Sequence, residues 1–297
     1  MSDDHAYDDE IEASRAPLLE HLNELRKRLI ICVAALVVGF AVCFGFSREI
    51  YLALLHPFEI AAQLLADKQA GHGGGAFDLL LVLAGVKEIS ANAGSSLKLV
   101  FTAPLEFFFT KLKLAGFGAV VITFPILAWQ IYAFVAPGLY KRERRAFIPF
   151  LFAAPALFAL GAAMVYYVIL PFVLWFSLSQ QIVGAGGISV ELLPKVSDYL
   201  TLVTTLLLAF GLCFQLPVVL SLLGLTGIVT AQALKQGRRF AIVGVFVIAA
   251  VVTPPDPISQ TLLAIPIILL YEISIWCVAL IERGRRKEEA RREIAPA

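Results

Sequence analysis

The sequence predicts an all-α membrane protein with six transmembrane helices, which are kinked and end in two short spans, and with both termini cytoplasmic. Three observations lead to this fold class. Hydrophobic residues make up 59% of the 297 residues and charged residues only 16%, whereas soluble domains carry about 25% charged residues. Uncharged segments of roughly 20 residues, the length that crosses a bilayer as a helix, recur along most of the chain. Lysine and arginine, moreover, gather in alternate loops.

Six segments are long and apolar enough, or nearly so, to cross the membrane. The first four are uncharged, and the prolines inside three of them predict kinks. The stretch 240–281 is too long for one span at about 1.5 Å per residue, and the proline cluster at 254–257 divides it into a hairpin of two short spans. We expect the membrane to be locally thin around the fifth span. The expected spans cover residues 29–47, 114–138, 147–177, 199–223, 240–254 and 257–281.

The distribution of basic residues predicts the orientation. Seventeen of the 24 lysines and arginines fall on one side of the expected spans. Cytoplasmic loops carry the excess of basic residues, so both termini are expected in the cytoplasm, which requires an even number of spans.

The chain, 1–297, is thus expected to form a single transmembrane domain. It begins with an acidic flexible N-terminus, 1–16, and ends with a charged cytoplasmic tail, 283–297. Between the first two spans, 48–113 is a long exterior loop, in which the apolar residues 79–86 are too few to span and are expected to cap the protein or lie at the interface.

The motifs that the chain lacks argue against an enzyme. No phosphate-binding Gly-x-x-x-x-Gly-Lys-Ser/Thr loop, His-Glu-x-x-His zinc pair or Gly-x-Ser-x-Gly elbow occurs in it. The four histidines lie outside the expected spans and the four cysteines inside apolar segments, which is not the pattern of a metal site or a disulfide framework. We expect no catalytic residue, cofactor or metal. A net charge of +1 gives no general attraction for nucleic acid.

Two carboxylates near the expected cytoplasmic face are candidate binding residues. Glu24 lies on an amphipathic helix whose leucines recur every three or four residues, and its simpler interpretation is an exposed pair with Arg28. Glu143 stands among four basic residues after the second span, where the simpler interpretation is a self-neutralising turn. The functional interpretation is that both carboxylates form a site for a cationic ligand, because paired carboxylates suit the planar guanidinium group.

Three further polar residues lie in or near the expected spans. Gln215 is mid-span, where its amide bonds either a neighbouring helix or an inserted ligand or partner helix. Glu272 is an intramembrane carboxylate close enough to the cytoplasmic end to reach water. Asp256 is placed to cap the start of the sixth span.

Two other functions compete with ligand binding. A proton- or ion-coupled small-solute transporter needs several charged groups at mid-membrane, and the chain offers few. A purely structural membrane scaffold has the same composition as a receptor.

Three strings of the sequence, in this order, resemble a known family. They are HLNELRKR (21–28), FVAPGLYKRERR (134–145) and TPPDPISQTLLAIP (253–266). Together they resemble the TatC family, the multispanning subunit of the twin-arginine protein translocase, over about 18–282. The resemblance implies a six-span receptor that binds the paired arginines of a signal peptide at the cytoplasmic face. With the single-span partners TatA and TatB and with other TatC copies, it is implied to move folded proteins outward using the proton-motive force.

The resemblance also implies roles for individual residues. The family's carboxylates that match Glu24 and Glu143 contact the signal arginines, and partner helices dock along the fifth and sixth spans. Many members have glutamate where this chain has Gln215, and an amide does not titrate near neutral pH. We therefore expect Gln215 to dock a partner and not to relay protons. Four further positions are implied to matter for function: Arg26, Pro57, Phe134 and Asp256.

Overall fold

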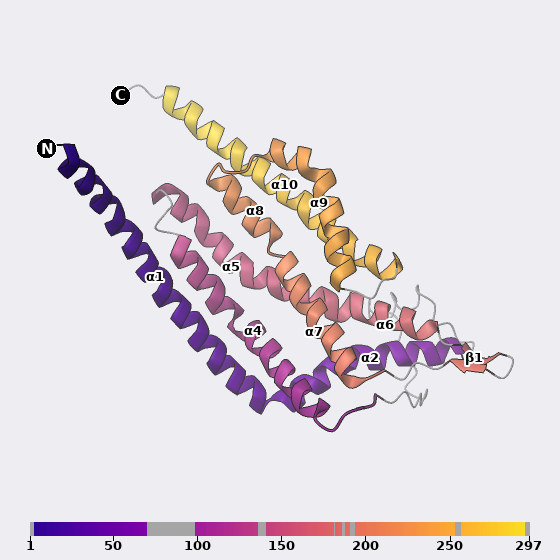
Figure 1. Ribbon diagram of the computed structural model, residues 1–297. Helices are drawn as coiled ribbons and strands as arrows, with labels where there is room; N and C mark the ends of the chain where they lie inside the picture. Colours follow the sequence, from indigo (N-terminus) through magenta and orange to yellow (C-terminus); the bar gives the residue numbers. More distant parts are fainter. Residues whose placement is uncertain are drawn as a thin grey trace.

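Long helices account for almost all of the structure, a computed structural model (Figure 1). It describes residues 3–69, 99–135, 141–180, 182–185, 188–190, 194–252 and 257–294. Only the backbone is described for 3–21, 66–69, 135, 141–148, 182–185, 188–190 and 287–294.

The helices follow one another with few other elements between them. A π-helical turn, η2 (Val165–Ile169), joins α5 to α6, and two antiparallel strands, β1 (Ile182–Ala185) and β2 (Ile188–Val190), lie between α6 and α7. Apart from this hairpin, the described residues agree with the expected all-α class. The helices are α1 (Asp3–Gly45), α2 (Ser47–Gln69), α4 (Glu106–Val135), α5 (Lys141–Met164), α6 (Leu170–Ser179), α7 (Val196–Cys213), α8 (Leu216–Leu225), α9 (Ala231–Val252) and α10 (Pro257–Ile294).

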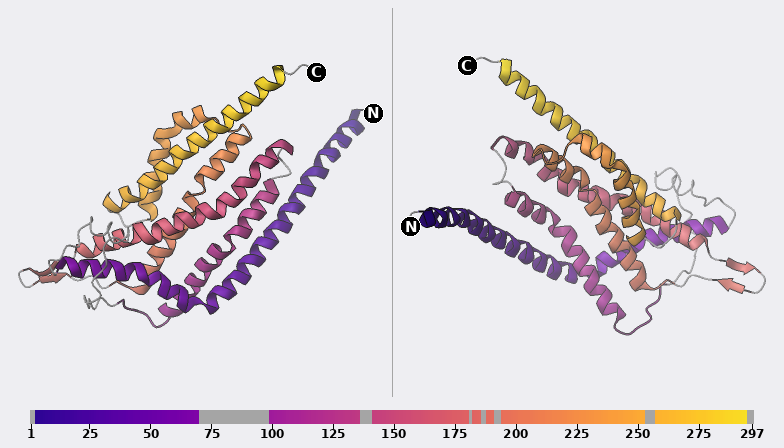
Figure 2. Two further views of the ribbon diagram at one scale, coloured as in Figure 1. Left: turned by 180° about the vertical axis from the view of Figure 1, so that it is seen from behind. Right: turned by 45° about the horizontal axis from the view of Figure 1, so that its top comes forward.

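Five helical segments of the described chain are long and apolar enough to cross a membrane, and they match five of the six expected spans. The fifth expected span, in α9, is not among them, because three basic residues lie in the first half of α9 and its uncharged part, 240–252, is short. The first turn of α1 and the last turn of α10 lie at the same end of the molecule (Figures 1 and 2). The five segments are Leu22–Gly45, Glu106–Phe134, Pro149–Ser179, Val196–Leu225 and Pro257–Arg286.

Both ends of the chain are more helical than expected. The N-terminal segment 1–16, expected to be flexible, is helical in its described part, because α1 begins at Asp3 and runs to Gly45 without interruption. Acidic residues are favourable near a helix N-terminus, and most residues of this segment are compatible with a helix. The charged tail likewise continues α10 as far as Ile294, because arginine, glutamate and alanine are strong helix formers.

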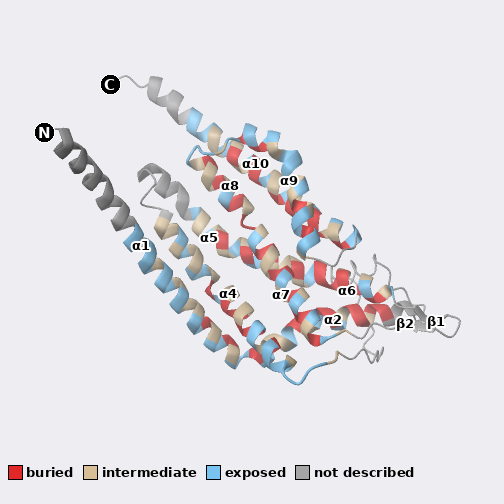
Figure 3. Ribbon diagram, in the orientation of Figure 1, coloured by how far each residue is buried: buried red, intermediate tan, exposed pale blue. Residues whose placement is uncertain are grey.

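The segment 48–113, which was expected to be an exterior loop, is also not a loop throughout. Helix α2 occupies its first part, and α4 begins at Glu106, before the expected start at 114. The expected cap, 79–86, lies outside the described residues. Helix α2 forms because apolar residues recur on one face, which it buries where it crosses α6 and α7 (Figure 3). The buried residues of this face are Leu54, Phe58, Ala61, Leu64 and Leu65.

Two of the expected kinks interrupt helices at prolines. Helix α5 passes into η2 just before Pro171, and α7 ends just before Pro217; each proline lies in the first turn of the next helix. A proline removes one helical hydrogen bond and crowds the preceding turn, so a wider or broken turn relieves the clash. Four other prolines remain inside continuous helices: Pro125, Pro149, Pro155 and Pro266.

Pro57 explains how α2 is fixed to the bundle. Because proline has no N–H, the carbonyl of Ala53, four residues earlier, loses its helical donor. The hydroxyl of Tyr166 in η2 donates to the Ala53 oxygen at 2.6 Å, and the hydroxyl of Tyr199 in α7 donates to the Leu54 oxygen at 2.6 Å. Tyr166 therefore replaces the donor that Pro57 lacks, and Tyr199 adds a bond to the next carbonyl, so that the two tyrosines attach α2 to η2 and α7.

Small residues allow α1 and α4 to pack closely. A methyl group added at Gly39 of α1 would lie 2.8 Å from Cγ2 of Thr123, and one added at Gly118 of α4 would lie 2.8 Å from Sγ of Cys43. Close backbone approach through small residues is a common way for helices to associate in membranes. This contact sets the separation of α1 and α4 along their length.

Removing the tyrosine hydroxyls is expected to loosen α2. Tyr199→Phe removes the hydroxyl that donates from α7 to the Leu54 carbonyl and should lower the free energy of unfolding by about 1 kcal/mol, measured by thermal unfolding of the purified protein in detergent. Tyr166→Phe should be destabilising too, but less so in a Pro57→Ala background, because residue 57 then has an N–H for the carbonyl that Tyr166 serves. Tyr167→Phe is the matched control. Strictly additive effects of Pro57→Ala and Tyr166→Phe would contradict this account.

Candidate functional site

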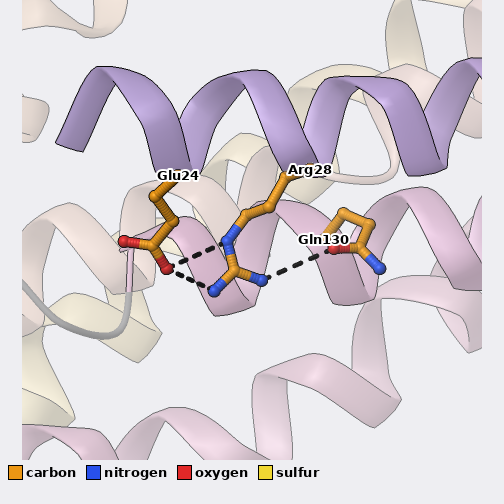
Figure 4. A network of polar contacts seen from close by, with 3 residues as sticks. All are labelled: Glu24, Arg28 and Gln130. Atoms are coloured by element: carbon orange, nitrogen blue, oxygen red, sulfur yellow. Dashed lines mark hydrogen bonds and ion pairs between the residues drawn. The ribbon is translucent and has the colours of Figure 1, made fainter. Parts of the chain in front are cut away.

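Arg28 connects Glu24 to helix α4 (Figure 4). Its Nε and Nη2 donate to Oε1 of Glu24 at 3.2 and 2.5 Å, and its Nη1 donates to Oε1 of Gln130 on α4 at 3.4 Å. The expected pair between Glu24 and Arg28 is thus present, and it forms part of a contact between two helices. The Glu24 side chain keeps 33% of its surface exposed.

The contact leaves part of the Glu24 carboxylate available. Nε and Nη2 of Arg28 both donate to Oε1 of Glu24, and the other oxygen, Oε2, points away from the arginine (Figure 4). Within the described part of the chain, no group donates a hydrogen bond to Oε2. An ionised carboxylate accepts several hydrogen bonds, so Glu24 can accept a second cationic donor or exchange Arg28 for one.

Glu143 lies close to the end of α4 that carries Gln130. Helix α5 begins at Lys141, which places Glu143 in its first turn, and this turn lies beside the last turns of α4 (Figures 1 and 2). The Glu143 side chain is outside the described part of the structure. The backbone therefore places Glu24 on α1 and Glu143 in the first turn of α5, with the last turns of α4 beside each of them.

The other predicted residues divide between the two ends of the molecule. Arg26 is exposed on α1, near Glu24, and Phe134 is half-buried in the last turn of α4. Pro57 is buried in α2, at the opposite end, where its effect is on the attachment of α2. Asp256 lies outside the described residues.

Gln215 is buried at the break between α7 and α8. Its backbone N–H bonds Leu212 O at 2.9 Å, so Gly211 O, four residues earlier, lacks its usual helical donor. The side-chain Nε2 donates to Gly211 O at 3.4 Å and to Ala154 O of α5 at 3.0 Å. The amide thus makes the hydrogen bond to a neighbouring helix that was one of its two interpretations; its docking role stays a prediction.

Glu272 of α10 has a partner that the sequence alone did not reveal. Arg238 of α9 meets it through two bonds, Nε to Oε1 at 2.7 Å and Nη2 to Oε2 at 2.8 Å. Arg238 and Glu272 are the same number of residues before and after Pro255. Two helices that fold back on each other at this proline turn would therefore bring the two side chains together, and the predicted hairpin could have revealed the pair. Gln130 was missed as well, because it falls within an expected span and belongs to no recognisable motif.

Comparison with known proteins identifies one family. Residues 20–266 match the family described as Sec-independent protein translocase protein (TatC). A TatC from Magnetococcus marinus is 40% identical over 279 residues, covering 94% of this chain and 90% of the relative. A TatC from Escherichia coli is 33% identical over 274 residues, 92% of each chain. The crystal structure of a twin-arginine translocase receptor, TatC, has a TM-score of 0.68 at 32% identity and covers 88% of this chain and 99% of that chain.

Two substitutions of Gln215 test its bond to α5. Gln215→Leu removes the donor and should destabilise the purified protein by about 1 kcal/mol. Gln215→Glu should be close to the original protein in acidic buffer, because a protonated carboxyl donates to Ala154 O, and should lose stability as the pH rises, because a carboxylate cannot donate. Thermal unfolding at several pH values measures both effects. A pH-independent stability of Gln215→Glu relative to the unsubstituted protein would contradict the assignment of the amide as donor.

Proposed function

Because the chain belongs to the TatC family of Sec-independent protein translocase proteins, we propose that it is the receptor for twin-arginine signal peptides and the core subunit of a translocase. In this role it exports folded proteins across the membrane, driven by the proton-motive force. The observation that carries the proposal is the Glu24 carboxylate, which binds the guanidinium group of Arg28 through one oxygen and keeps the other available.

The proposed binding site comprises Glu24, Glu143 and Arg26, at the junction of α1, α4 and α5. An arginine of the signal peptide approaches Oε2 of Glu24 or takes the place of Arg28. A guanidinium group presents two parallel donors to a carboxylate, whereas a lysine presents a point charge. Arginine is therefore bound in preference to lysine at the same position.

The remaining predicted residues are proposed to support this site or the docking of partners. Phe134 is half-buried in the last turn of α4, which suits contact with the apolar part of a signal peptide. Gln215 and Asp256 are proposed to contribute to docking, and Pro57 acts by holding α2 in place. The proposed partners are TatA, TatB and further TatC copies.

The orientation in the membrane is part of the proposal. Six spans with both termini in the cytoplasm are supported by the basic residues on one side of the chain and by the shared end of α1 and α10 (Figure 1). Helix α9 is then the fifth span. Its uncharged part, 240–252, extends over only about 20 Å at ~1.5 Å per residue, against roughly 30 Å of hydrocarbon. We propose that the membrane is thinner around α9.

A crosslinking experiment tests the signal-peptide site. A peptide with Arg-Arg before an apolar segment, carrying a photoreactive group, should crosslink near Glu24 and Glu143 in membranes that contain the protein. A Lys-Lys peptide should bind more weakly, and Glu24→Ala with Glu143→Ala should reduce binding of the Arg-Arg peptide by about tenfold or more, because a charge-assisted hydrogen bond contributes about 1.5–3 kcal/mol. Glu59→Ala, an exposed carboxylate of α2, is the matched control.

Two outcomes would rule out this site. One is equal crosslinking of the Arg-Arg and Lys-Lys peptides; the other is unchanged binding after both carboxylates are removed. Size-exclusion chromatography of each variant shows whether it is folded, so that a loss of binding reports on the site.

Cysteine labelling tests the orientation. In intact spheroplasts, a membrane-impermeant maleimide should label Gly73→Cys in the exterior segment but neither Ser2→Cys nor Ala297→Cys, and all three should react once the membrane is opened. The unsubstituted protein is the control, because its four cysteines lie within helices. Labelling of either terminus in intact spheroplasts would contradict the six-span topology.

A further inference from the structure

A pocket of about 430 Å³ lies where α1 gives way to α2 and α4 begins. This junction is at the end of the bundle opposite the first turn of α1 and the last turn of α10 (Figure 1). Helices α1 and α4 both contain candidate membrane spans, which end at Gly45 and begin at Glu106 beside the pocket. The pocket therefore lies at the level of one membrane surface, where lipid headgroups meet hydrocarbon.

Two basic side chains line this pocket. They are Arg48 of α2 and Lys111 of α4, and neither forms an ion pair with another residue in the part of the chain that the structure describes. The Nζ of Lys111 lies 4.8 Å from the centre of the Phe44 ring, a cation–π contact that leaves its charge uncompensated. The neighbouring carboxylates, Glu49 and Glu106, do not line the pocket. The pocket therefore attracts an anion.

Two hydroxyl-bearing residues line the same pocket. As whole residues, Ser47 is 4% exposed and Thr110 is 6% exposed, so the pocket is the surface that they share with their surroundings. A hydroxyl group can donate a hydrogen bond to a ligand bound beside it. A ligand with several acceptor oxygens would satisfy both hydroxyls and both cations together.

Apart from Tyr51, the rest of the lining is apolar, and part of it is exposed at the surface of the bundle. Leu52 of α2 is 55% exposed and Phe107 of α4 is 60% exposed, and Leu114 closes the inner side. Exposed apolar side chains beside a cationic pocket match a ligand that carries an anionic head and a hydrocarbon chain. A free inorganic anion would leave this apolar lining without a partner.

We propose that this pocket binds the headgroup of an anionic phospholipid. The phosphate lies between Arg48 and Lys111 and accepts hydrogen bonds from Ser47 and Thr110, while an acyl chain lies along the apolar lining. The lipid belongs to the leaflet opposite the one that faces the chain termini. The inference rests on the membrane placement in the proposed function but not on signal-peptide binding.

Native mass spectrometry of the purified full-length protein in a mild detergent tests this site. The protein should retain several-fold more phosphatidylglycerol than phosphatidylcholine with the same acyl chains. Arg48→Gln with Lys111→Gln should reduce the retained phosphatidylglycerol to the phosphatidylcholine level. Lys113→Gln is the matched control, because Lys113 lies two residues along α4 but lines a different pocket, beside Ser197 and Thr204. Glycerol phosphate, which has the headgroup chemistry but no acyl chain, should not displace the lipid at equal concentration.

Three results would overturn the proposal: equal retention of the two lipids, unchanged phosphatidylglycerol binding by the double variant, or full displacement by glycerol phosphate, which would indicate a site for a soluble phosphate. Size-exclusion chromatography and thermal unfolding show whether the double variant is folded. Its crosslinking to the Arg-Arg peptide should be unchanged, so failure of the lipid site and failure of the signal-peptide site are distinguishable.

Discussion

In a membrane, every backbone carbonyl and amide that lacks a helical partner must find one within the protein, because hydrocarbon supplies none. The prolines of this chain make that constraint decisive. Pro57 removes the donor to Ala53, the hydroxyl of Tyr166 in η2 replaces it, and Tyr199 of α7 donates to the neighbouring Leu54 carbonyl. At the break before Pro217, the Gln215 side chain bonds Gly211 O and also reaches α5. At both places, the side chain that satisfies the backbone also joins separate helices.

The two arginine–carboxylate pairs differ in how many of the carboxylate oxygens receive a hydrogen bond. Arg238 bonds both oxygens of Glu272 and so links α9 to α10. Arg28 bonds a single oxygen of Glu24 and turns its remaining nitrogen to Gln130. Glu24 therefore keeps one oxygen that receives no donor from the described residues, whereas each oxygen of Glu272 receives one. An ion-coupled transporter would need a free carboxylate within the membrane, and the pairing of Glu272 argues against that function.

The features that could be predicted from the sequence are those that depend on local composition. Uncharged segments identified the five helical segments long enough to span, and the spacing of leucines placed Glu24 on a helix. Helix α2 was not predicted, because charged residues occur along its sequence and Pro57 lies inside it, and a proline usually indicates the end of a helix. The contacts of Tyr166 and Tyr199 with α2 join residues far apart in the sequence, and no local pattern encodes them. Gln130 became part of the candidate site only through the packing of α1 on α4.

The two ends of the bundle differ in the kind of polar group that they leave without a partner. Where α1, α4 and α5 meet, a carboxylate oxygen of Glu24 remains available, which favours cations. At the opposite end, Arg48 and Lys111 supply donors, which favours anions. Basic residues at that end run against the excess on the other side of the chain, so the general charge bias of membrane proteins does not explain them. A local ligand does, and the hydroxyl-bearing residues Ser47 and Thr110 line the same pocket and can donate to it.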